Sequence, residues 1–186
     1  MNLTELQQAA QVEFNEIRSR VPNRLAIHAS PRLVILPDRF MRKRGGAAAV
    51  YFWLCLSPQI LAAPPTVRKA IIAHEWGHIA EGHANAMTIA LIGLALYGLI
   101  TLLSPPGLLW PTINLAILAV MAVGIAWALH RTREFEADAV AADAVGAAAV
   151  AEALRWNSAT LFSGEQSDDM RERLRRLDAR ADRERS

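Results

Sequence analysis

The feature that most constrains the fold is a central stretch without charge. No Asp, Glu, Lys or Arg occurs between Glu81 and Arg131, whereas both ends of the chain are densely charged. The segment Ser104-Pro105-Pro106-Gly107 divides this stretch into apolar runs of 18 and 21 residues, at 86–103 and 109–129. Because about 20 apolar residues span the hydrocarbon core of a bilayer as a helix, we expect two transmembrane helices that form a hairpin.

The alternative is a buried helical hairpin in a soluble protein. Such helices usually carry a polar face, but these runs contain only scattered threonine and asparagine, so we favour the bilayer. Basic residues flank the hairpin on both sides (Arg68, Lys69, Arg131 and Arg133), and the turn between the helices has none. The positive-inside rule therefore predicts that both chain ends lie in the cytoplasm. We expect an integral membrane protein of a bacterial-type inner membrane with its active site facing the cytoplasm.

The charged segments predict a small domain of helices and strands. Apolar residues at steps of three and four indicate a first helix that ends near Pro22. Short runs rich in β-branched or aromatic residues predict strands at Arg24–Ala29, Arg32–Leu36 and Ala47–Leu56. Helices are expected again after residue 131, as far as Trp156 and at Met170–Arg185, where the mixture of acids and bases predicts a solvated face. We expect one α+β domain over residues 1–186, mostly α with a small sheet, into which the hairpin is inserted.

Composition excludes several classes of function. Cys55 is the only cysteine, so the chain forms no intramolecular disulfide and no cysteine-based zinc site. The formal net charge is only +2, and the basic residues are not interleaved with aromatic ones, so we expect no nucleic-acid partner.

The sequence His74-Glu75-Trp76-Gly77-His78 matches the HExxH pattern and falls on a helix expected to start at Pro64-Pro65-Thr66. Four residues advance a helix by about 400°, so both imidazoles project from one face and can bind one metal ion. Glu75 lies about 100° round the helix from His74, beside the metal, where it can take a proton from water. These positions predict His74 and His78 as ligands and Glu75 as the base.

A catalytic zinc usually has three protein ligands. Gly82 and His83 are out of register with the longer HExxHxxGxxH pattern, and His83 points about 140° away from His78 on a continuing helix. After the hairpin, Glu134 and Asp138 share one helical face, whereas Glu136 lies on the other. Glu134 and Asp138 are therefore the pair from which a third ligand is expected.

HEWGH, an apolar hairpin and REFEAD, in this order, resemble the integral-membrane zinc metallopeptidases typified by HtpX and the type I CAAX prenyl proteases. The resemblance covers roughly Arg24 to Ala181. It implies a zincin-type domain with one Zn²⁺ per chain, in which Glu134, the first glutamate of the ExxAD segment, completes the ligand set of His74 and His78. It also implies that Asp138 orients a ligating histidine. The expected activity is hydrolysis of peptide bonds in protein or peptide substrates, in membrane-protein quality control.

This chain departs from the family pattern in two places. It lacks the N-terminal transmembrane helices of HtpX, which leaves two spans instead of four, and Ser163–Asp169 stands where a His-Pro commonly precedes the last helix. In the family, the strand before the metal helix presents an edge to an extended peptide. Here that would be Val50–Ser57, and a plain core strand is the alternative. Candidate donors to the oxyanion are His28, Tyr51, His83, His130 and Arg131.

Two other hypotheses are compatible with the sequence. In one, the chain is a catalytically silent membrane scaffold or regulator with a metallopeptidase-like domain. In the other, it binds no metal and is a small helical membrane protein with a cytoplasmic interaction tail. An intact Glu75 argues against the first reading, because a purely structural zinc site has no use for a base. The sequence indicates neither the substrate nor the oligomeric state.

Overall fold

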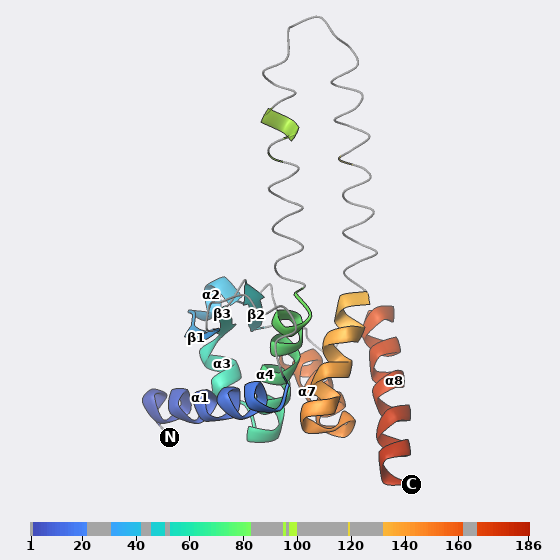
Figure 1. The fold of residues 1–186 in the computed structure, drawn as a ribbon. Helices are drawn as coiled ribbons and strands as arrows, with labels where there is room; N and C mark the ends of the chain where they lie inside the picture. The colour runs from blue at the N-terminus through green and yellow to red at the C-terminus, as the bar shows by residue number, and fades with distance from the viewer. Residues whose placement is uncertain are drawn as a thin grey trace, which may run out of the picture.

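The structure is a computed structural model that describes residues 2–21, 31–41, 46–50, 53–82, 95, 97–99, 119, 132–161 and 167–186 (Figure 1). Helices predominate over a three-stranded sheet, which confirms the expected α+β class. The elements are α1 (Leu3–Arg20), β1 (Arg32–Ile35), α2 (Asp38–Met41), β2 (Ala47–Val50), β3 (Trp53–Leu56), α3 (Pro58–Leu61), α4 (Pro65–Ala80), α7 (Ala147–Leu161) and α8 (Asp168–Arg185). Residues 132–145 are also helical.

Helix α1 docks against α4 through the apolar stripe that the sequence predicts. Phe14 is buried and meets the ring of Trp76 edge to face, with centroids 5.7 Å apart. The Trp76 indole donates a hydrogen bond of 3.0 Å to the Val21 carbonyl oxygen, just beyond the end of α1. Arg68, which is 3% exposed, binds both carboxylate oxygens of Glu13 at 2.8 and 2.7 Å. The tryptophan of HEWGH thus anchors α1 instead of facing the metal.

The sheet corrects two predictions. Ala47–Leu56 is not one strand, because β2 and β3 pair antiparallel as a hairpin. Strand β3 also pairs parallel with β1, so the sheet order is β1-β3-β2 and β3 is the central strand. The prediction of a peptide-binding edge at Val50–Ser57 is therefore wrong for β3, because both edges of this strand are paired within the sheet. The edge strand that packs against α4 is β2. The predicted strand Arg24–Ala29 lies outside the described residues.

The helices after the hairpin differ from the prediction in two respects. The helix expected to run to Trp156 is interrupted at Gly146, whose φ of +90° favours glycine; α7 then starts at Ala147. Helix α8 is not only a solvated face. It buries Arg173, Leu174, Leu177 and Ala181, and it packs along α7. One core cluster joins α1, the sheet, α4, α7 and α8.

The predicted transmembrane runs 86–103 and 109–129 lie outside the described residues, apart from 95, 97–99 and 119. Among the residues that the structure describes, no helix combines the length and the apolar character that a membrane crossing requires.

Gly77 sets the distance between α4 and residues 132–145. A Cβ atom added at Gly77 would lie 2.9 Å from the Cα atom and 3.0 Å from the carbonyl oxygen of Ala137. These are backbone atoms, which cannot rotate away as the end of a side chain can. Glycine at this position lets the backbones of the two helices touch, one residue from His78 on α4 and one residue from Asp138 on its partner.

We predict that Gly77→Ala destabilises the fold by about 1–3 kcal/mol through overpacking. In an unhindered helix the same change is stabilising by about 1 kcal/mol. A loss of stability in Gly77→Ala would therefore indicate the close approach to Ala137. Denaturant unfolding in detergent measures the effect. Gly98→Ala is the control, because an added Cβ there meets no described atom within 4 Å. Equal effects at the two positions would contradict the close approach.

Candidate metal centre

Three predicted ligands converge between α4 and residues 132–145. His74 and His78 lie one turn apart on α4, and their Nε2 atoms are 3.2 Å from each other. The Glu134 carboxylate faces both: Oε2 is 3.4 Å from His74 Nε2, and Oε1 is 3.3 Å from His78 Nε2. The three side chains are half-buried, each 15 or 16% exposed. Two segments that are far apart in the sequence thus form one cluster.

The spacing of these donor atoms fits a tetrahedral metal ion. Ligands that lie about 2.0–2.1 Å from one zinc ion at tetrahedral angles are about 3.3–3.4 Å from each other. The two Nε2 atoms, 3.2 Å apart, are close to this edge length, and each has its own Glu134 oxygen nearby, Oε2 at 3.4 Å from His74 and Oε1 at 3.3 Å from His78. All three ligand atoms lie within 4.8 Å of one another, and two imidazole nitrogens with one carboxylate oxygen are a donor set that zinc prefers. The residues present therefore fit the predicted metal.

Asp138 stands behind the ligands, one helical turn after Glu134. Its Oδ1 atom lies 2.9 Å from Nδ1 of His74, the ring nitrogen that faces away from Glu134. Asp138 is 4% exposed. A carboxylate in this place fixes the tautomer and the orientation of a ligating imidazole. The structure thus places Asp138 where the resemblance implied, next to a histidine and not in the ligand cluster.

Arg173 is a member of the site that the sequence analysis missed. Its Nε and Nη2 atoms donate to the two oxygens of Asp138 at 2.7 and 2.8 Å, and Nη1 lies 2.8 Å from Oε2 of Glu134. Arg173 is 8% exposed. Its burial could have been suspected from its position one residue before Leu174 and four before Leu177, which form the buried face of α8.

The charges of the site support one another. Burial alone would lower the pKa of His74, but the carboxylates of Asp138 and Glu134 more than offset this and raise the pKa to about 10. Burial would likewise raise the pKa of Glu134, yet His74, His78 and Arg173 hold it well below its usual range. Arg173 and His74 also keep the pKa of Asp138 low. Both carboxylates are therefore ionised, and His74 gives up a proton when its Nε2 binds a metal ion.

Glu75 differs from the other acids of the site. It is buried on α4, at 9% exposure, next to His74 in the sequence. Within the described part of the chain, no ion pair or hydrogen bond engages its carboxylate, in contrast to Glu134 and Asp138. An uncommitted carboxylate beside the ligands is free to accept a proton. The predicted oxyanion donors His28, Tyr51, His83, His130 and Arg131 all lie outside the described residues.

A helix with HExxH packed against a helix with a glutamate and an aspartate defines a metallopeptidase of the HExxH class. The model of peptidase family M48 matches residues 55–180, roughly two thirds of the chain, and this range includes every member of the site. The chain belongs to peptidase family M48, which confirms the resemblance to HtpX-like and CAAX-type proteases. No curated protein and no solved structure gave a significant match.

We predict that Arg173→Gln lowers the free energy of unfolding by about 3–5 kcal/mol, because it leaves two buried carboxylates without their cation. Chemical denaturation in the presence of a metal chelator measures this. Arg175→Gln is the matched control on α8: its side chain is 73% exposed and pairs with Glu172, so a loss of less than about 1 kcal/mol is expected. A similarly small loss at Arg173 would contradict its role as the counter-ion.

Proposed function

We propose that the chain is a zinc-dependent endopeptidase that is anchored in a membrane and hydrolyses peptide bonds of protein substrates. Membership of family M48 supports a metal-dependent peptidase. Zinc is the proposed ion because two imidazole nitrogens 3.2 Å apart and a carboxylate that faces both of them are a donor set that zinc prefers. His74, His78 and Glu134 are the proposed ligands of one ion.

The chain's own residues divide the work of hydrolysis. When bound, zinc would supply Lewis acidity that polarises the scissile carbonyl and makes a neighbouring water more acidic. Glu75 takes the proton of that water and delivers it to the nitrogen of the leaving amine. The Asp138 carboxylate lies 2.9 Å from Nδ1 of His74 and orients the ring, while Arg173 pairs with Asp138 and with one oxygen of Glu134. These contacts keep the ligands in place while the proton moves.

Strand β2 is the proposed docking edge for an extended substrate. It pairs with β3 on one side and packs against α4, the helix that carries HExxH. Among the described strands, none pairs with its other side. A peptide added there would be held mainly through backbone hydrogen bonds, which depend little on side-chain identity. Weak sequence preference suits a peptidase that removes damaged membrane proteins, and we propose this quality-control role.

The proposed anchor is the charge-free segment between Glu81 and Arg131, with helices at 86–103 and 109–129. The basic residues that flank it favour an active site on the cytoplasmic side. Two of these residues also serve the fold, since Arg68 pairs with Glu13 and Lys69 pairs with Glu16. Positive charge is therefore less available on this flank than the sequence suggests, and the orientation depends more on Arg131 and Arg133.

We predict that Glu75→Gln abolishes cleavage of an unfolded membrane-protein substrate, by at least about a hundredfold, and leaves zinc bound. The amide keeps the size of the side chain but cannot accept the proton. Peptide release and zinc content, measured on the same detergent-purified sample, test the loss of cleavage and the retention of zinc.

Glu136→Gln is the matched control, because Glu136 is exposed and lies on the other face of the second helix. Full activity in Glu75→Gln would contradict the proposed base. A wild-type protein that binds zinc but cleaves no protein or peptide would favour the hypothesis of a catalytically silent scaffold.

A further inference from the structure

The described ends of the segments that flank the predicted hairpin lie on one side of the molecule. In Figure 1, the end of α4 and the start of residues 132–145 both lie at the upper side, and the short helical turn at residues 97–99 lies further out on that side, clear of the other elements. A bilayer that holds helices 86–103 and 109–129 would therefore face this upper side.

Part of the sheet layer faces the same side. Figure 1 shows α1 and α3 below the sheet and α2 above it. Side chains alternate across a strand, so Leu54 and Leu56 share one face of β3, and both belong to the core cluster. Trp53 and Cys55 belong to the opposite face of β3, on which Cys55 is buried and Trp53 is exposed. Trp53 is 53% exposed and Phe40 of α2 is 60% exposed, so two large aromatic side chains stand in solvent on this layer.

The same layer carries arginines that have no acidic partner among the described residues. Arg32 is level with Trp53 in the β1–β3 register, and the Arg39 guanidinium lies 4.8 Å from the centre of the Phe40 ring. Neither arginine forms an ion pair with a described carboxylate, and Asp38 is the only acid among the described residues of α2 and the sheet. Further along the chain, the sequence adds Arg42, Lys43 and Arg44.

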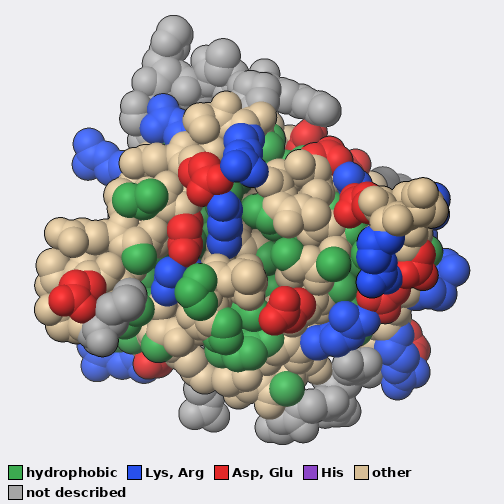
Figure 2. Space-filling model, turned by 90° about the horizontal axis from the view of Figure 1, so that it is seen from below, with side chains coloured by type: hydrophobic (Ala, Val, Ile, Leu, Met, Phe, Trp, Pro, Cys, Tyr) green, Lys and Arg blue, Asp and Glu red, His purple; other side chains and the backbone are tan. Residues whose placement is uncertain are grey.

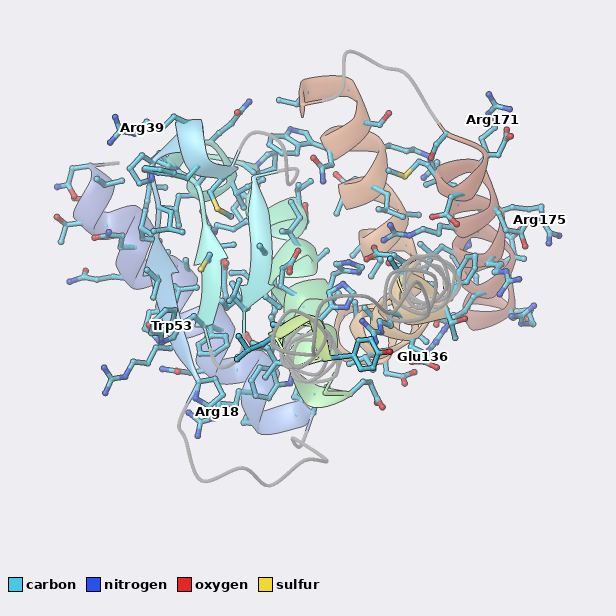
Figure 3. The ribbon with its side chains drawn as sticks, turned by 90° about the horizontal axis from the view of Figure 1, so that it is seen from above. Arg18, Arg39, Trp53, Glu136, Arg171 and Arg175 are labelled. Carbon is cyan, nitrogen blue, oxygen red and sulfur yellow. The ribbon has the colours of Figure 1, made fainter. Side chains whose placement is uncertain are left out.

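Most arginines of α8 are arranged differently, because they pair with carboxylates: Arg171 with Asp168, Arg175 and Arg176 with Glu172, and Arg180 with Asp143 and Glu184. Figure 2, which shows the lower face, likewise has basic and acidic side chains interspersed. Trp53 and Arg39 lie well away from Arg171 and Arg175 of α8 (Figure 3). Among the described residues, large exposed aromatic rings and arginines that form no ion pair occur together on the sheet layer.

We propose that Arg32, Arg39, Phe40 and Trp53 form a membrane-contact surface that lies in the headgroup layer of an anionic bilayer. This inference rests on the proposed membrane anchor. Tryptophan and other aromatic side chains prefer the interface between water and hydrocarbon, and arginine is attracted to anionic headgroups. Trp53 and α2 lie at opposite ends of the sheet, because β1 and β3 are parallel and α2 follows β1. Two separated contacts would fix the tilt of the domain and hold β2 beside the membrane.

The test uses the full chain reconstituted into vesicles that contain phosphatidylglycerol. In a Cys55→Ala background, the single variants Phe40→Cys, Trp53→Cys and Val12→Cys each carry an environment-sensitive fluorophore on the new thiol. Val12 is the matched control, because it is 67% exposed but lies on α1, below the sheet. We expect quenchers attached near the lipid headgroup to reduce emission at 40 and 53 at least about threefold more than at 12. Equal quenching at the three positions would overturn the proposal.

Charge is tested with paired substitutions. Arg32→Gln with Arg39→Gln should remove most of the difference in quenching between phosphatidylglycerol and phosphatidylcholine vesicles, because the anionic headgroups then lose their partners. The control pair is Arg171→Gln with Arg175→Gln, on exposed positions of α8, which should leave that difference unchanged. An identical response of both pairs would contradict the assignment of the cations.

Carbonate extraction tests the proposed anchor separately from the surface, and quenching by aqueous iodide distinguishes contact with lipid from contact with protein. If alkaline carbonate washes the chain off the vesicles, the proposed anchor fails, whereas lipid quenching at 40 and 53 before the wash still supports the surface. Labels that are shielded from aqueous iodide but not quenched by lipid would show that protein covers the sheet. A second copy or a bound peptide would then be the occupant, and the proposal would be wrong.

Discussion

The contact between α4 and residues 132–145 is the constraint on which the rest of the structure depends. It joins the two halves of the metal centre, which the sequence separates by the whole apolar segment, and it does so through touching backbones at Gly77 and Ala137. A helix pair that is held apart by ordinary side chains has its axes about 8–10 Å from each other. Because the glycine permits a closer approach, the short side chain of Glu134 reaches both His74 and His78, and that of Asp138 reaches His74.

Around this contact, each residue of HEWGH has a separate task. The two histidines face Glu134, Glu75 remains uncommitted, Trp76 anchors α1, and Gly77 admits the second helix. The second helix is in turn supported from behind, where Arg173 of α8 binds both of its acidic site residues. A cation in that place neutralises charge that two carboxylates would otherwise bury without compensation. The C-terminal helix is therefore part of the metal centre and not an appendage to it.

The sequence predicted the residues that have a fixed chemical spacing. His74, Glu75 and His78 follow from the helical repeat, and Glu134 and Asp138 follow from the resemblance together with their shared face. It did not predict Arg173, because a charged helix looks solvated until its partners across the fold are known. It also merged β2 and β3 into one strand, since the residues between them continue the same apolar and aromatic character. Pairing partners, unlike helix faces, are set by tertiary contacts.

The central claim is that Glu134 completes a zinc site with His74 and His78. Zinc content of detergent-purified protein tests it most directly, with Glu134→Ala compared against Glu136→Ala, two residues further along the same helix. The account predicts about one zinc per chain in the wild type and in Glu136→Ala, and less than about 0.2 in Glu134→Ala. Zinc retained in Glu134→Ala but lost in Asp138→Ala would contradict the ligand assignment.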